Sequence, residues 1–158
     1  MGIMDNLKSI ANYFTGGGAE ISMEVPRAAR AGEPLPVVVH ATIGDVSVRA
    51  SRIFVAVRAV ETIDAHYTHG ILENRPGSKS PVHVTTTMYS HDFPVLGAIE
   101  LPAGSTHTWY VDVVLPPDAV PTYLGKHARH EWMVSAVIDV AGTDPQSQWT
   151  PIFVRPAC

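Results

Sequence analysis

Cysteine is nearly absent from this chain of 158 residues, and its single cysteine, Cys158, is the last residue. No internal disulfide can therefore form, and nothing in the sequence indicates an oxidising compartment. Charged residues are also scarce, at 16%, and the formal net charge is -4. Because the chain has no basic stripe, we expect no nucleic-acid partner.

Long apolar runs are missing as well. No segment approaches the roughly 18 consecutive apolar residues of a membrane span. The N-terminus has neither the basic region nor the continuous apolar core of a secretory signal. There is also no glycine-rich phosphate loop between a strand and a helix. These absences predict a cytoplasmic protein without membrane contact and without a nucleotide cofactor.

Proline and glycine, in contrast, are frequent and dispersed, with 13 and 12 residues. They divide the chain into short apolar segments, which favours an all-β sandwich over a helical bundle. The clearest period-two alternation lies in residues 107–115 and 132–140, around Trp109 and Trp132. We expect these two segments to be neighbouring strands of one sheet that cover a shared core, joined by a turn-rich connection.

Further strands are predicted over residues 19–25, 35–43, 48–62, 82–93, 99–101 and 148–154. The segment 48–62 exceeds the usual ~3 to 10 residues of a strand, so it should contain a bend or bulge. Residues 63–81 contain glycine, proline and serine with little alternation, and this pattern predicts a long loop that could serve in recognition.

The N-terminal segment predicts the one helix. Apolar residues recur at three- and four-residue spacing over residues 1–14, and three glycines follow at 16–18. The expected organisation is therefore a short amphipathic helix with a glycine-rich joint over residues 1–18, followed by one sandwich domain over residues 19–158.

The order of these segments resembles the arrestin-like superfamily. The matching pieces are an A-G-E turn at residues 31–33, a V-x-V strand at 53–60, a P-A-G turn at 102–104, an aromatic strand running into L-P at 109–116, and P-x-x-x-G from Pro121 to Gly125 before a strand at 132–140. The sequence is most similar to bacterial arrestin-like proteins of the sporulation-control type.

This resemblance implies an immunoglobulin-like sandwich of two antiparallel sheets that acts as a non-catalytic protein-interaction scaffold, with no cofactor. The expected partner is a protein, and a homodimer through an edge strand or through the N-terminal helix is an alternative. Candidate partner-binding residues lie on the predicted helix and in the predicted loop, namely Leu7, Ile10, Phe14, Tyr67, Ile71 and Leu72.

Eight histidines raise the rival function of a small-ligand or metal-binding sandwich. The closest pairs are His66 with His69 and His127 with His130, all in predicted loops. A zinc site needs three or four converging ligands, so exposed loop histidines are the favoured interpretation and no native metal site is expected. We also expect no enzyme activity, because the run Ser90-His91-Asp92 cannot converge as a triad along a single strand.

Overall fold

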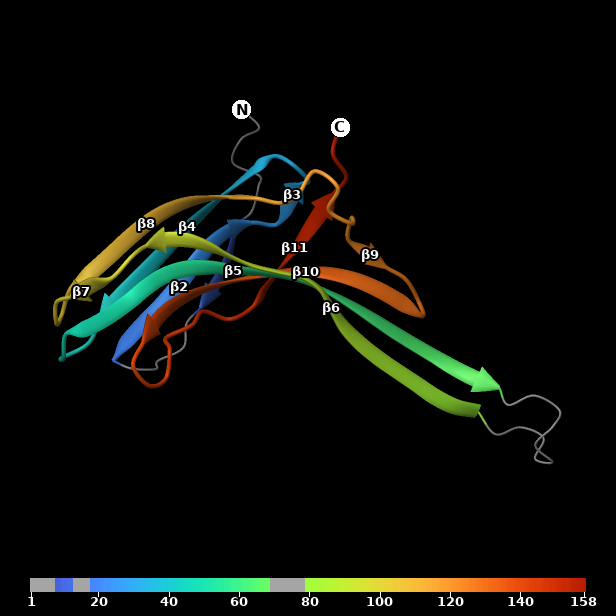
Figure 1. Cartoon of the computed structure of the whole chain (residues 1–158), viewed down its shortest axis with the longest axis horizontal. Coiled ribbons are helices and arrows are strands. Elements are labelled where there is room, and N and C mark those ends of the chain that lie inside the picture. Colours follow the sequence, from blue (N-terminus) through green and yellow to red (C-terminus); the bar gives the residue numbers. More distant parts are fainter. Residues whose placement is uncertain (1–7, 13–17, 69–78) are drawn as a thin grey trace.

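The computed structural model describes residues 8–12, 18–68 and 79–158, and within them every regular element is a β-strand. The strands form two sheets packed face to face, from which one hairpin projects far beyond the sandwich (Figure 1). The predicted all-β sandwich is thus confirmed. The described residues contain no helix that is long and apolar enough to cross a membrane.

The first sheet has four antiparallel strands in the order β1-β2-β4-β8. Their bounds are β1 Lys8–Asn12, β2 Ala19–Pro26, β4 Pro34–Ile43 and β8 Thr106–Val114. Strands β2 and β4 match the segments predicted from alternation to within a residue at each end. Strand β8 begins directly after the turn at Gly104, whose φ of 70° suits glycine better than any other residue.

The second sheet has seven strands, five of them in the order β3-β11-β10-β5-β6. Their bounds are β3 Ala28–Arg30, β5 Val48–Thr68, β6 Lys79–Leu96, β10 Ala128–Val140 and β11 Thr150–Arg155. Two short strands lie beside this path: β7 Ile99–Leu101 pairs with β5, and β9 Tyr123–Leu124 pairs with β10. All pairs are antiparallel except β3 with β11, which is parallel.

The core lies between the two sheets and consists of the inward-facing residue of each alternating pair. Trp132 is the largest fully buried side chain, and Ile21, Met23, Val39 and Val55 are among those packed with it. Burying one such aliphatic side chain contributes roughly 1.5–3 kcal/mol. Trp109, expected in the core, is only half-buried because it lies on β8, at the edge of its sheet.

The two strands with the clearest alternation are not neighbours in one sheet, and this prediction was wrong. Strand β8 pairs with β4 in the first sheet, whereas β10 pairs with β5 and β11 in the second. The connection over residues 115–127 crosses from one sheet to the other. Alternation identifies the face that each strand buries, and both faces do cover a common core, but it carries no information on which strands exchange hydrogen bonds.

The predicted N-terminal helix is also corrected where the structure describes it. Residues Lys8–Asn12 form strand β1, which pairs with β2 in the register Ser9 to Val25 and Ala11 to Met23. The pairing is favourable because an unpaired sheet edge offers a row of backbone donors and acceptors. The remainder of the predicted helix, including Leu7 and Phe14, lies outside the described residues.

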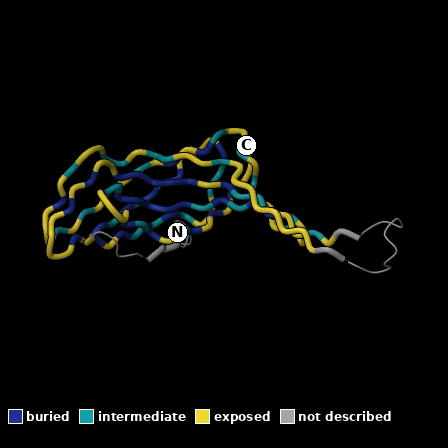
Figure 2. Tube along the Cα trace, turned by 60° about the horizontal axis from the view of Figure 1, so that its bottom comes forward, coloured by how far each residue is buried: buried dark blue, intermediate teal, exposed yellow. Residues whose placement is uncertain are grey.

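Where the structure describes it, the predicted loop over residues 63–81 continues two strands, and residues 69–78 lie outside the described residues. Strand β5 runs on to Thr68 and β6 begins at Lys79, with Ile63 paired to Val84 and Ala65 to Val82. The expected irregularity of the long strand is present, since the β5–β6 register shifts between Ile53 and Phe54 and again further along. Figure 2 shows that both strands of this hairpin are exposed where they leave the buried body.

A second, smaller buried cluster lies on the outer side of β10. Val137 belongs to this cluster, and Ser135 on the same strand is buried as well. The segment before β11 crosses this face. Ser147 accepts a hydrogen bond at its hydroxyl from the buried amide of Ala136 at 2.8 Å, and Ser135 donates to the Ser147 carbonyl at 2.7 Å. These bonds fix the crossing segment against the sheet.

Candidate functional site

Strand β6 presents a long free edge of the second sheet. Within the described residues it pairs on one side with β5, and no strand pairs with its other side. Pro81 and Pro94 bound an uninterrupted run over residues 82–93 in which Asp92 is the only acidic residue and there is no lysine or arginine. Natural edges are usually blocked by proline, by lysine or by covering segments, so this run is open to an added strand.

One face of the projecting hairpin is apolar and exposed. Ile63, Val82 and Val84 have exposed fractions of 40%, 40% and 46%. Across the hairpin, Val84 faces Ile63 and Val82 faces Ala65, so these side chains form one surface, called here the hairpin face. Such a group of exposed apolar side chains is typical of a contact surface.

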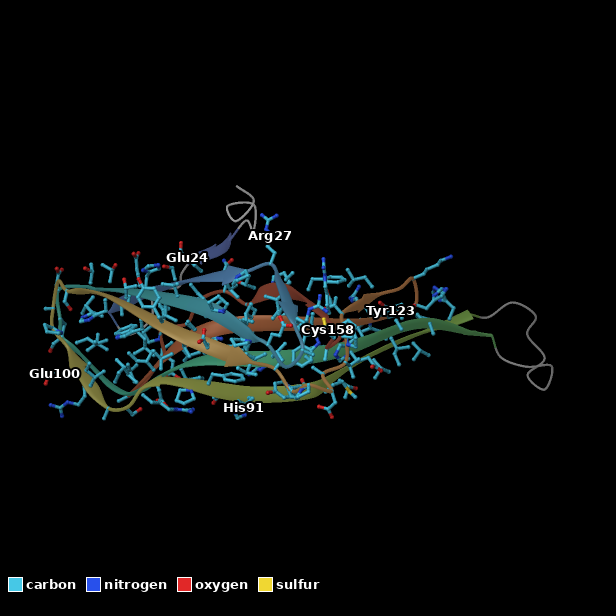
Figure 3. All side chains as sticks on the ribbon, turned by 90° about the horizontal axis from the view of Figure 1, so that it is seen from above. Glu24, Arg27, His91, Glu100, Tyr123 and Cys158 are labelled. Atoms are coloured by element: carbon cyan, nitrogen blue, oxygen red, sulfur yellow. The ribbon has the colours of Figure 1, made fainter. Side chains whose placement is uncertain are left out.

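More exposed apolar residues surround the root of the hairpin. Met88 on β6, Val120 before β9, and Tyr123 and Leu124 on β9 are all more than half exposed. Figure 3 places Tyr123 beside the start of the hairpin, whereas Glu100 lies at the opposite end of the molecule. The hairpin and its root therefore carry seven of the exposed large apolar residues of the described chain.

A cavity of about 280 Å³ opens at the same root, and we call it the root cavity. Its walls include the rings of Tyr89 and Trp132, the side chains of Met88 and Val120, and the polar residues Asp118 and His130. Hydrogen bonds to β10 and β11 hold the segment that roofs it in place. The Trp132 indole Nε1 donates to the Val120 carbonyl at 2.8 Å, and the Thr122 amide donates to the Val154 carbonyl at 2.9 Å.

His130 is an anomaly in this wall. Its side chain is buried, with an exposed residue fraction of 4%, and neither ring nitrogen has a hydrogen-bond partner in the described part of the chain. The nearest carboxylate oxygen, Glu61 Oε2, lies 3.9 Å from Nδ1, which is too far for a hydrogen bond. Buried polar groups are nearly always paired, so this imidazole is an exception that requires an explanation.

The other predicted metal candidates are partly brought together. His66 on β5 and His127 before β10 line a second hollow of about 490 Å³ with His83 and Asp64. Asp64 accepts a hydrogen bond from His83, and this bond holds the pKa of the Asp64 carboxyl below its usual value. Among residues 8–12, 18–68 and 79–158, no three histidine, cysteine, aspartate or glutamate residues are placed so that together they could hold a metal ion.

Two of these histidines are not in loops, contrary to the prediction. His66 belongs to strand β5, and His130 belongs to β10, where it faces the sandwich interior instead of the solvent. The expectation was wrong because β5 and β10 both extend further than their alternation indicates. His69 lies outside the described residues.

The predicted partner-binding residues have mixed positions. Tyr67 lies near the end of β5 and Ile10 in the middle of β1. Leu7, Phe14, Ile71 and Leu72 are outside the described residues. Sequence reasoning missed Val82, Val84 and Met88, although the valine alternation in Val82-His83-Val84 was a usable signal for an exposed strand face.

No protein-family model matches the sequence, and no curated protein matches it either. Among solved structures, the crystal structure of the sporulation control protein Spo0M from Bacillus subtilis matches with a TM-score of 0.60 and 21% sequence identity. The chain has the arrestin-like fold of Spo0M.

The similarity covers 89% of this chain and 50% of the Spo0M chain, so this chain spans about half the length of Spo0M. At this level of identity the likeness to Spo0M concerns the fold. It confirms the architecture that the order of the A-G-E, P-A-G and L-P segments implied.

Proposed function

We propose that this protein is a non-catalytic interaction module that binds a partner protein by adding a strand of the partner to the β6 edge. The observation that carries the proposal is the free edge over residues 82–93, which has no proline, lysine or arginine to block pairing. An added strand would gain backbone hydrogen bonds along this edge and side-chain contacts on the hairpin face.

The hairpin determines what kind of strand fits. Val82 and Val84 point to the hairpin face, while the intervening His83 and its neighbour Thr85 lie on the opposite, polar face. A partner strand should therefore alternate apolar residues with serine, threonine or asparagine. Because the hairpin projects from the sandwich (Figure 1), a partner can reach both of its faces without a clash against the first sheet.

The likeness to Spo0M supports a regulatory role in a bacterial cytoplasm, and this part of the proposal rests on the fold alone. A second copy of the chain is one protein that could occupy the edge. Light scattering over a range of concentrations distinguishes self-pairing from binding to another protein, since self-pairing gives a mass that rises with concentration.

The edge is tested by placing a charge on it. Val84→Lys puts an ammonium group on the hairpin face at a side chain that is 46% exposed, so folding should be little affected. Val46→Lys is the matched control, because Val46 is 71% exposed and lies between β4 and β5, away from the edge.

A photo-cross-linking residue at Thr87 reports on the contact directly. We expect cross-links to a specific protein in cell extract that Val84→Lys abolishes and Val46→Lys leaves unchanged, with slowed amide exchange in β6 of the complex. Equal cross-linking by all three proteins, or the absence of any specific product together with measurable turnover of a substrate, would rule out the edge as the binding site.

A further inference from the structure

The root cavity has walls that suit an apolar body. Tyr89 and Trp132 pack with ring centroids 5.2 Å apart at 48°, and His130 meets Trp132 at 5.9 Å and 70°. These three successively tilted rings form a curved aromatic surface on β6 and β10. Met88 and Val120 are the exposed apolar residues at its margin, and the remaining lining residues are two alanines, a proline and Asp118.

The charge of the cavity has one sign. Asp118 is the only formally charged residue of the lining, and it is exposed. Behind His130, Glu61 brings a second carboxylate within 3.9 Å of the ring. No lysine or arginine lines the cavity. An anionic ligand would therefore meet two carboxylates without a counter-charge, whereas a cation would be attracted to the margin and to the aromatic faces.

The volume is sufficient for a compact organic molecule. A dry protein cavity of about 150 Å³ accommodates benzene, and the root cavity measures about 280 Å³. A ring or a short branched alkyl group with one polar substituent thus fits. His130 adds a buried imidazole whose hydrogen-bonding capacity no residue of the described chain uses.

We propose that the root cavity binds an organic amine, with the apolar body against Trp132 and Tyr89 and the ammonium group directed to Asp118. The buried His130 ring, which has no hydrogen-bond partner in the described chain, supplies a further polar group in the wall for a substituent of the ligand. The root cavity shares Met88 and Tyr89 with the β6 edge, but a small amine needs no added strand, so its binding is tested independently of the proposed protein interaction.

Three ring compounds of nearly equal size test the proposal: benzylammonium, benzyl alcohol and benzoate. Binding is followed by tryptophan fluorescence and by the NMR signals of Met88. We expect saturable binding in the order benzylammonium, benzyl alcohol, benzoate, and displacement of the Met88 methyl signal by the first. A capped lysine amide, titrated in parallel, shows whether a free amine or the lysine side chain of a partner is preferred.

Asp118→Asn is the decisive variant, since it removes the charge from an exposed residue while preserving its shape. It should weaken benzylammonium binding by roughly two- to fivefold and leave benzyl alcohol unaffected. Asp45→Asn, an exposed carboxylate in the turn before β5, is the control and should change neither affinity. Benzoate binding as tightly as benzylammonium, or no saturable binding by any of the three, would overturn the proposal.

Discussion

Replacing His130 with leucine should stabilise the protein. The neutral imidazole has one donor and one acceptor, and in the described chain both are buried without a partner. Each such unsatisfied group costs about 1–3 kcal/mol. Leucine removes both groups and keeps most of the apolar volume, with a penalty for imperfect fit of less than ~1.5 kcal/mol. The two groups together cost about 2–6 kcal/mol, so the expected net change is an increase of roughly 0.5–6 kcal/mol in the free energy of unfolding.

Urea denaturation followed by tryptophan fluorescence measures this change, because Trp132 packs against His130. For a chain of this size, the increase corresponds to a rise in Tm of roughly 1–24 °C. His127→Leu is the control, since His127 is exposed before β10 and its replacement should alter stability by no more than ~0.5 kcal/mol. An unchanged slope with denaturant shows that the unfolded states remain comparable.

A His130→Leu protein that is as stable as the wild type, or less stable, would refute the reasoning. It would mean that the imidazole is paired in solution, with water or with the Glu61 carboxylate after a small movement. If the variant is more stable but no longer binds benzylammonium, His130 is a residue retained for binding at a cost in stability.

Three further predictions concern other parts of the fold. His83→Leu should raise the pKa of Asp64, because the hydrogen bond that lowers this pKa is lost, and carboxyl-detected NMR would measure the change. The Asp64 pKa is depressed in the folded state, so the stability that this pair contributes is present above the unfolded pKa. It is lost as the pH falls through the folded pKa. Ser147→Ala should lower the free energy of unfolding by about 1–3 kcal/mol, because it leaves a buried amide without its acceptor, and urea denaturation would show this loss. Gly104→Ala should lower the free energy of unfolding by about 1 kcal/mol, because the φ of Gly104 is 70°. Gly97→Ala should be neutral or slightly stabilising, because Gly97 has open space around it and no positive φ. Calorimetry resolves the difference between the two variants.

The alternation of apolar residues was enough to predict an all-β sandwich and most of its strands. Strands such as β2 and β4 bury one face, so every second residue had to be apolar, and this pattern is local. The order of the turns and strands was enough to indicate the arrestin-like fold, because short motifs at set intervals reflect where the chain must reverse.

Pairing between strands was decided by tertiary structure. The alternation around Trp109 and Trp132 was equally compatible with one sheet or two, and only the path of the connection between them places them in opposite sheets. Likewise, Lys8–Asn12 is a strand because β2 offers a free edge, a long-range interaction that a local helical period cannot reveal.

The features of the candidate site, too, come from the tertiary structure and not from the local sequence pattern. The sequence by itself determined a sandwich whose strands bury one face. Tertiary structure alone extended β5 and β6 into a projecting hairpin, left β6 as an open edge, and enclosed His130 beside Trp132 in the root cavity. The physical reason is that the local pattern specifies which side of a strand avoids water, whereas edges and cavities arise from how distant segments meet.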